Sequence, residues 1–388
     1  MGDPARMPDV NPFPEDYGPK KPPLSFLLRG SAYPSDTIPD PFQGGEPPRT
    51  SNRIRNYRRI GNWENFFLDS AICSVAKALG EEIDDFHFFS AITGDMFAYL
   101  YSLSHPCDSG ITNYFFVPQV VKKAFAAIGY SCRYLSNAQI QEDFSTVMNA
   151  IRDSVDQGIP VLAWGMGNVI TADGSHWDPL PEGCLIGGYD RDDVLYVNLY
   201  LGPERATVDE DGYTAVTRGL DTTMGLFFIG DKLDKPDMRE IYREVLHTIP
   251  AFLSLPPTNG YCFGREAFEL WANTLTEETR FQGKTDKDLS GLCWDLHCSP
   301  YCAVCTTDSA SYIRRIVETY PDLTMAVKLL PLYEEIWRLK DEIWAYQGDF
   351  FPPMNRFRER SFRAHISGLL RRMGSVCDEI LKLYEEAL

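Results

Sequence analysis

Four residues between positions 73 and 198 have side chains that could support thiol chemistry. A nucleophilic cysteine needs a lowered pKa, which a helix N-terminus and a neighbouring imidazole provide, and a polar group that orients the imidazole. Cys73, in a predicted helix, is the candidate nucleophile, and His176, in the loop sequence GSHWD, is the candidate general base. Asp190 and Asn198, on a predicted hairpin, could each orient that base.

Each of these residues also fits an ordinary structural role. A buried cysteine behaves as a small hydrophobic residue, so Cys73 could simply pack beside the apolar face of its helix. His176 could be a surface loop residue. Asp190 could form the turn, and Asn198 could be a polar residue of the hairpin. The residue types alone leave the catalytic and the structural interpretation open.

A second group of candidate residues lies in the sequence CWDLHCSPYCAVC. Cys293, Cys298, Cys302 and Cys305 follow one another at spacings of five, four and three, with His297 among them. Thiolates and imidazole are zinc ligands, but zinc sites usually pair two CxxC hooks, and only Cys302 and Cys305 have that spacing. The same segment is rich in apolar residues. It therefore predicts either a structural metal site or a set of buried reduced thiols.

Composition and charge exclude several classes of function. The formal charge of −18 and the isoelectric point near 4.8 argue against nucleic acid and against an anionic membrane surface. No apolar run approaches the roughly 18 residues of a membrane span, and the acidic, proline-containing start does not resemble a signal peptide. No phosphate-binding glycine loop, HExxH or Gly-x-Ser-x-Gly motif occurs, so no cofactor is predicted. We expect a cytoplasmic protein whose ten cysteines are thiols rather than disulfides.

The candidate nucleophile is positioned by a predicted helix between residues 69 and 80. Asp69 and Ser70 are good N-cap residues, and Gly80 is a good C-terminal cap. Between them, apolar residues recur at the i, i+3, i+4, i+7 spacing of one helix face. This spacing predicts a short buried helix with Cys73 in its first turns, near its positive end.

The elements around this helix predict an α+β domain over residues 53–235. A Gly-Asp turn at 94–95 separates two predicted helices, and further helices are predicted over 118–128 and 139–157. The predicted strands are 130–135, 159–164, a hairpin of 184–190 with 194–202, and 224–232. Helices followed by an antiparallel sheet are typical of an α+β fold.

The two ends of the chain differ from this domain. Residues 1–52 are proline-rich and are predicted to form an extended or disordered arm. Residues 236–388 are predicted to form an all-α domain. Its predicted helices include 268–275, with Phe268, Trp271, Ala272 and Leu275 on one face, and also 310–320, 323–346 and 353–388. Asp308 or Ser309 is the predicted N-cap of the helix over 310–320, and Asp322 that of the helix over 323–346.

The order of these elements resembles a known family. The sequences concerned are DSAICSVAKALG, IPVLAWG, CLIGGYDRDDVLYVNL and LFFIGDK. They resemble the papain-like domain of bacteriocin-processing cysteine peptidases, and more specifically the N-terminal domain of the family related to butirosin biosynthesis protein H. FGREAFELWANTL, WDLHCSPYC and the helical tail resemble the C-terminal helical region of such relatives, so the resemblance runs from about residue 55 to the end.

The resemblance implies a fold, a triad and a reaction. In the family, a cysteine at a helix N-terminus, a histidine before a Gly-Tyr pair and an Asp or Asn on the next strand form the triad. The activity implied is transfer of an acyl group from a carrier-protein thioester to an amine, or amide hydrolysis. An acyl carrier protein, or a peptide or amine substrate, would then be the partner, in bacterial natural-product biosynthesis.

This sequence departs from the family at two of the three triad positions. Counting back from Gly80, the family nucleophile falls near Phe66 or Phe67. The histidine position falls within 182–184, which contains no histidine, so His176 would have to substitute from the preceding loop. Asn198 lies where the third member is expected.

Two hypotheses follow from the sequence. The first is a papain-like thiol acyltransferase or amide hydrolase with Cys73, His176 and Asn198 or Asp190 in the triad roles. The second is a catalytically inactive relative that uses the former active-site cleft to bind a peptide, a small molecule or a partner protein. Loss of the base lowers the rate by orders of magnitude, because the base activates the thiol and protonates the leaving group.

Overall fold

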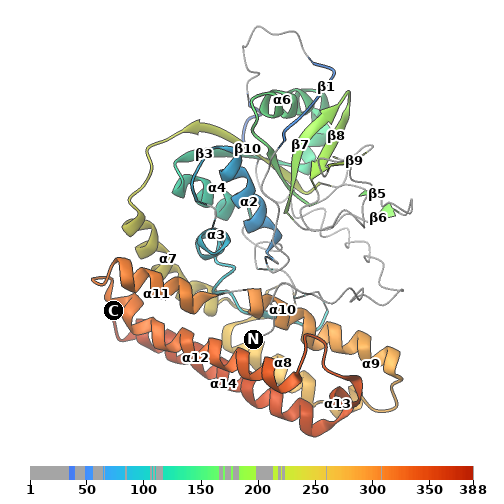
Figure 1. Cartoon of the computed structure of the whole chain (residues 1–388), viewed down its shortest axis with the longest axis vertical. Helices are drawn as coiled ribbons and strands as arrows, with labels where there is room; N and C mark the ends of the chain where they lie inside the picture. Colours follow the sequence, from blue (N-terminus) through green and yellow to red (C-terminus); the bar gives the residue numbers. More distant parts are fainter. Residues whose placement is uncertain are drawn as a thin grey trace. The chain divides into compact units, whose positions relative to one another are not determined.

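The computed structural model of the chain combines helices with antiparallel sheet and divides into two compact units (Figure 1). The described part of unit 1 comes from residues 35–89 and 117–236, and that of unit 2 from residues 90–110 and 237–387. The structure describes residues 35–39, 49–55, 64, 66–83, 85–104, 107, 110, 117–165, 169–170, 176–177, 183–197, 213–216, 220, 223–258, 260–306 and 308–387.

Unit 1 is organised around a seven-stranded antiparallel sheet with the order β3-β10-β4-β7-β8-β9, in which β1 also pairs with β7. The strands are β1 (Ser51–Arg53), β3 (Tyr130–Ser136), β4 (Val161–Trp164), β7 (Gly183–Asp190), β8 (Asp193–Val197), β9 (Tyr213–Val216) and β10 (Gly225–Lys232). β5 (Val169–Ile170) and β6 (His176–Trp177) form a separate pair. The predicted strands over 130–135, 159–164 and 224–232 and the predicted hairpin are confirmed, and residues 198–202 of the second hairpin strand lie outside the described residues.

Side chains of this sheet alternate between two buried faces, as the period of a strand requires. One face packs with the helices α5 (Asn137–Glu142) and α6 (Phe144–Asp156) in a core that includes Ala163, Ile186 and Leu226. Their sequence neighbours Leu162, Leu185 and Phe227 are paired across the strands on the other face and are also fully buried. A sheet buried on both faces needs helices on both sides.

The helices on the second face are α2 (Phe67–Ala78), which packs on β4 and β7, and α4 (Val117–Ala127), which packs on β3. The helix predicted over 118–128 is therefore confirmed. Gly129, which follows α4, has φ +83°, as a left-handed helix end requires. The helix that carries Cys73 thus lies on β7, the first strand of the predicted hairpin, and on its neighbour β4.

The helix predicted over 139–157 is wrong in one respect, because it is two helices. α5 and α6 meet at Asp143, whose backbone is non-helical at φ −135° and ψ 56°. Its side-chain Oδ1 accepts a hydrogen bond from Thr146 N at 3.3 Å. An aspartate that caps the next turn restarts the helix inside an otherwise continuous amphipathic pattern.

Two described pieces of the proline-rich N-terminal region belong to unit 1. Asp36 N donates to Tyr134 O, and Tyr134 N donates to Asp36 Oδ2, each at 2.8 Å. β1 pairs with β7 so that Ser51 lies opposite Asp190. These extended segments add to the sheet, and the other residues of the predicted arm lie outside the described residues.

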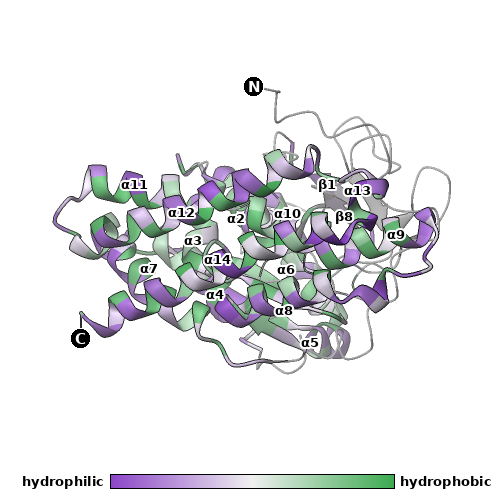
Figure 2. Ribbon diagram, turned by 90° about the horizontal axis from the view of Figure 1, so that it is seen from below, coloured by the Kyte–Doolittle hydropathy of each residue, from purple (hydrophilic) through white to green (hydrophobic). Residues whose placement is uncertain are grey.

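Unit 2 contains the C-terminal helical region that the sequence predicts. Its helices are α7 (Met238–Leu253), α8 (Gly264–Thr276), α9 (Asp286–Cys293), α10 (Ser299–Thr306), α11 (Ser309–Thr319), α12 (Thr324–Gln347), α13 (Met354–Arg358) and α14 (Arg360–Glu385). Hydrophobic and hydrophilic residues alternate along α12 and α14 in Figure 2. The four apolar residues predicted on one face of α8 are all buried.

Unit 2 is not entirely helical, which corrects the prediction of an all-α domain. α3 (Phe86–Thr93) matches the first helix predicted beside Gly94, but the second predicted helix is a turn followed by the strand β2 (Leu100–Ser102). β2 pairs with β11 (Tyr261–Phe263). The apolar residues of β2 lack a helical period. Its partner strand β11 is remote in sequence, so the local sequence pattern could not predict this pairing.

The predicted N-caps have different outcomes. Asp308 caps α11, because its Oδ1 accepts a hydrogen bond from Ser311 N at 3.0 Å. Asp322 does not cap α12, whose N-cap is Leu323, and the Asp322 carboxylate instead pairs with Arg239. The helix predicted over 353–388 is interrupted at Glu359, where the backbone is extended and separates α13 from α14.

Gly264, the first residue of α8, provides a test of this packing. Its φ is +53°, and a Cβ atom there would lie 2.2 Å from the Leu253 carbonyl oxygen. We expect Gly264→Ala to destabilise unit 2 by about 2 kcal/mol in urea unfolding. An alanine is strained at this positive φ, and its Cβ would clash with the Leu253 carbonyl oxygen. Gly291→Ala is the control: its Cβ meets nothing within 4 Å, and a helical alanine stabilises by about 0.5–1 kcal/mol. Equal effects of the two substitutions would contradict the packing at Gly264.

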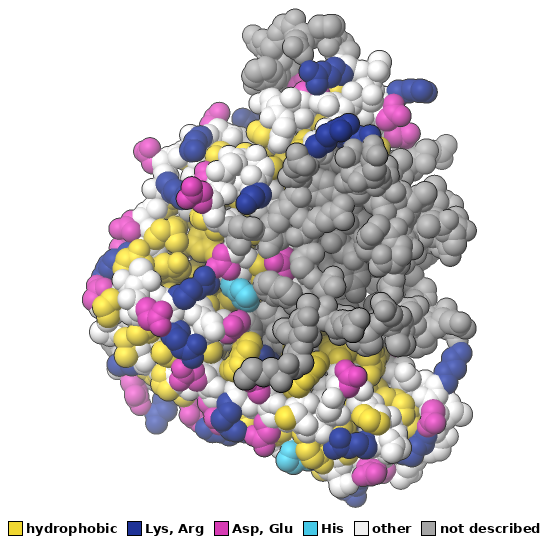
Figure 3. Space-filling view, viewed as in Figure 1, with side chains coloured by type: hydrophobic (Ala, Val, Ile, Leu, Met, Phe, Trp, Pro, Cys, Tyr) yellow, Lys and Arg dark blue, Asp and Glu magenta, His cyan; other side chains and the backbone are white. Residues whose placement is uncertain are grey.

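Two surface properties bear on the excluded function classes. Among the described residues, no helix is long and apolar enough to cross a membrane. Acidic and basic side chains intermix on the described surface seen in Figure 3. The many ion pairs of α12 and α14, such as Arg338 with Glu335 and Arg372 with Glu379, belong to this mixed surface.

Candidate functional site

The helix that carries the candidate thiol begins earlier than its sequence predicts. Its first residue is Phe67, and its N-cap is Phe66, which makes no side-chain capping hydrogen bond. Ser70 N already donates to Phe66 O at 3.1 Å, so the first helical hydrogen bond forms before the predicted cap. Asp69 and Ser70 are therefore residues of the first turn rather than N-caps, a position that also suits an acidic side chain.

This shift moves Cys73 away from the positive end of the helix. Counted from Phe67, Cys73 is the seventh residue of α2, in its second turn. The unpaired N–H groups and the positive end of the dipole are confined to the first turn of a helix. The Cys73 side chain is also 0% exposed. The resemblance suggested by the sequence would place a nucleophile near Phe66 or Phe67, and both of these residues are aromatic.

Polar residues at the start of α2 are buried together. The Ser70 hydroxyl donates to the Glu64 carboxylate at 3.2 Å, and the Ser74 hydroxyl donates to Ser70 O at 2.9 Å. Glu64, Asp69 and Ser70 are all nearly inaccessible to solvent. These contacts fix how the chain enters α2; the sequence indicated Asp69 and Ser70 only as caps and did not indicate Glu64 or Ser74. A serine and two carboxylates near a helix start are the only signal that could have indicated them.

Asp190 lies at the tip of the β7–β8 hairpin. It is paired with Asp193 across the turn, its side chain is 60% exposed, and its nearest cation is Arg191 at 3.9 Å. Arg191, in the turn, has φ +54°. An exposed aspartate beside a tight turn has the geometry of a turn residue, whereas the Cys73 thiol is fully buried.

The side chains of the other two predicted triad residues, His176 and Asn198, lie outside the described residues. The backbone of His176 lies in β6, opposite Ile170 of β5, and its side chain lies outside the described residues. Asn198 lies directly after β8 and is outside the described residues. The structure therefore places Cys73 and Asp190 in unlike environments and leaves the pairing of thiol and imidazole as a prediction.

The cysteine-rich segment of unit 2 is a continuous helical run made of α9, a π-helical turn over Trp294–Cys298 and α10. Among the described residues, no group of three or more His, Cys, Asp or Glu side chains is arranged to hold a metal ion. Cys293 and Cys298 are fully buried, and their Sγ atoms are 3.6 Å apart. Burial raises the pKa of the Cys298 thiol, and the neighbouring thiols of Cys293 and Cys302 raise it further. These properties are those of buried reduced thiols.

His297, in the middle of this segment, is held as a neutral side chain. Its Nε2 lies 2.8 Å from Gln347 Oε1, and because an amide oxygen only accepts, Nε2 carries the proton. The imidazole is fully buried among the rings of Trp271, Tyr301 and Phe357. Burial lowers the pKa of His297 to about 4. It therefore serves as a core residue of unit 2.

Comparison with known proteins adds no relative to this description. No protein-family model matches the chain, and no curated protein matches it. The resemblance to papain-like domains consequently depends on the residues quoted from the sequence.

Proposed function

We propose that unit 1 is a non-catalytic papain-like domain that binds a peptide, a small molecule or a partner protein. The observation that carries this proposal is the position of Cys73, which is fully buried in the second turn of α2. A thiol nucleophile must reach its substrate and must have a lowered pKa, and a helix lowers the pKa only of groups at its N-terminus.

Two further observations support a retained scaffold with altered chemistry. α2 packs on β4 and β7, as a papain-like helix packs on its sheet in the resemblance that the sequence suggests. The helix N-terminus, where a nucleophile would be most reactive, carries Phe66 and Phe67. An aromatic residue in place of a thiol removes the nucleophile, and Phe66 is instead buried in the core.

The proposal predicts that a thioester substrate does not acylate Cys73. We expect no acyl adduct by intact-protein mass spectrometry after incubation of the native chain with an acyl N-acetylcysteamine thioester. The rate of thioester loss should be the same for the wild-type chain and for Cys73→Ala. Because the thiol is buried, the substitution changes packing by only one small group, and circular dichroism would verify that the fold is kept.

Binding is tested separately by thermal unfolding of both chains against tripeptides and primary amines. Any ligand that raises the melting temperature of the wild-type chain should raise that of Cys73→Ala equally. An acyl group found on Cys73, or a turnover that Cys73→Ala abolishes while the fold is kept, would contradict the proposal and favour the acyltransferase or amide hydrolase.

A further inference from the structure

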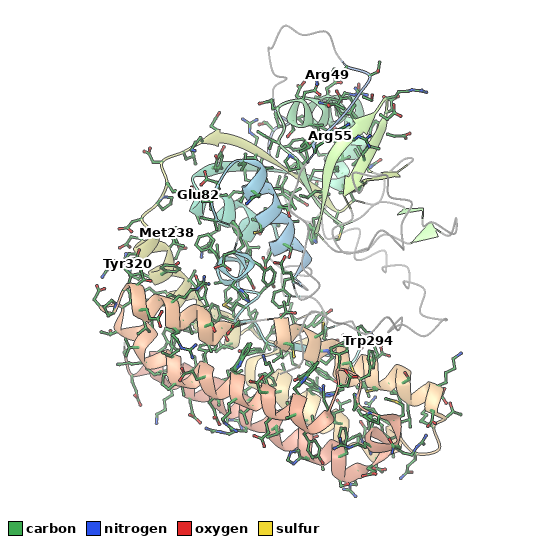
Figure 4. All side chains as sticks on the ribbon, viewed as in Figure 1. Arg49, Arg55, Glu82, Met238, Trp294 and Tyr320 are labelled. Atoms are coloured by element: carbon green, nitrogen blue, oxygen red, sulfur yellow. The ribbon has the colours of Figure 1, made fainter. Side chains whose placement is uncertain are left out.

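A π-helical turn connects α9 and α10 and determines where the thiols of unit 2 lie. The turn, η3, runs over Trp294–Cys298, and Ser299 N donates to Trp294 O in the i→i+5 pattern. Trp294, labelled in Figure 4, begins this turn. Such turns are rare, occur mostly as single turns inside α-helices, and are frequent at functional sites.

The π turn brings together two cysteines that an α-helix would separate. Residues five apart in an α-helix point about 140° away from each other around the axis. In a π turn, the i→i+5 hydrogen bond places such residues one above the other. Cys293 and Cys298 have this spacing, and their Sγ atoms are 3.6 Å apart.

Cys298 and Trp294 also contact the loop between α12 and α13. The Cys298 thiol donates to Phe350 O at 3.4 Å, and the ring of Trp294 stacks on Phe351 with centroids 5.8 Å apart. Phe350 and Phe351 are only half-buried. The Cys298 thiol thus lies against a short surface segment, and the side chains of Cys293 and Cys298 are both fully buried.

We propose that Cys293 and Cys298 are a redox-active dithiol that closes to a disulfide across the π turn when it meets a peroxide. One thiol attacks the O–O bond of hydrogen peroxide, which yields a sulfenic acid and one molecule of water. The second thiol then attacks that sulfur and releases a second molecule of water. The two sulfurs lose two electrons in total, and both peroxide oxygens leave as water.

The short distance between the Cys293 and Cys298 Sγ atoms favours a disulfide between these two residues. The sulfurs must approach from 3.6 Å to a bond length of about 2 Å, which a rotation of the side chains on a stacked pair provides. Closing the bond removes the Cys298 S–H, so Phe350 O loses this donor. The contact between the dithiol and the loop is therefore weakened on oxidation.

The test is disulfide mapping of the full-length chain. The chain is reduced, shown to be folded by near-ultraviolet circular dichroism, treated with hydrogen peroxide, and alkylated after denaturation. We expect peptide mass spectrometry to find a Cys293–Cys298 linkage that dithiothreitol reverses. Both thiols remaining alkylatable, or a linkage to Cys302 or another cysteine instead, would overturn the proposal.

Variants separate the pair from the other thiols. Cys293→Ser and Cys298→Ser should each abolish the linkage, whereas Cys262→Ser, at a half-buried thiol of β11, should retain it. If a serine variant fails to fold, the linkage in the wild-type chain and its retention in Cys262→Ser still decide the question. Loss of the linkage in Cys262→Ser would assign the oxidation to a different pair.

Discussion

Replacing Arg363 with methionine is expected to destabilise unit 2 by about 3–5 kcal/mol. The guanidinium of Arg363 is fully buried and donates to Leu275 O, Phe357 O and Arg358 O at 2.6–3.0 Å. It also donates to the Glu278 carboxylate at 2.8 Å. Methionine would fill a similar volume but leave the carbonyl oxygens without donors in a buried site, which is the costly case.

Hydrogen exchange of α14 in the full-length chain measures this effect, because it reports the local stability of the helix that carries the substitution. Arg371→Met is the matched control on the same helix. Arg371 is half-buried at the surface, donates to Asn273 Oδ1 and pairs with Glu269, and such surface contacts are worth about 0–1 kcal/mol. Similar changes in exchange for the two variants would show that Arg363 is not the central polar contact described here.

The second large effect is a loss of stability in acid that depends on His297. Its pKa is about 4 in the folded chain because of burial, against an ordinary value of 6.5. The folded state therefore binds fewer protons than the unfolded state, and stability falls as the pH drops from 6.5 towards 4. Below that range this group adds no further slope. The full change is on the order of 3 kcal/mol.

His297→Gln isolates this contribution from the many carboxylates of the chain. Glutamine keeps an amide N–H for Gln347 Oε1 but does not titrate. The measurement is the free energy of unfolding of both chains in urea between pH 7 and pH 4. The difference between them should change by about 3 kcal/mol over that range. A difference that does not vary with pH would mean that His297 is not buried as a neutral side chain.

Much of the fold could be predicted from periodicity. The strands over 130–135, 159–164 and 224–232, and the apolar face of α8, follow directly from patterns of period two and 3.6. These patterns are strong because each element buries one face or both faces in a core. The element ends were harder, since several residues near a helix start can act as caps.

The errors at Asp69–Ser70 and at Asp143 have the same physical origin. An aspartate or serine is favourable at the N-cap and also in the first turn, so Asp69 could not fix the start of α2. Asp143 does cap a helix, within a run whose apolar spacing continues through it. The local sequence does not show which of these residues is the N-cap, because the start of each helix also depends on how it packs on the sheet.

The candidate site was predicted less well than the fold. Cys73 lies on the predicted helix, but its distance from the helix N-terminus depends on where that helix begins. The observed N-cap, Phe66, lies three residues before Asp69, which places the buried thiol in the second turn. The meeting of Cys293 and Cys298 could not be predicted either. Their spacing of five places them apart in an α-helix, and only the π turn brings the sulfurs together.

The central claim is that the α2 thiol is a core residue, and alkylation of the native chain tests it most directly. Iodoacetamide at neutral pH, followed by peptide mass spectrometry, gives the order in which the cysteines react. We expect the half-buried Cys262 to be labelled before Cys73, and Cys73 to be labelled only when the chain unfolds. Rapid, selective labelling of Cys73 in the folded chain would contradict the account and identify an active thiol.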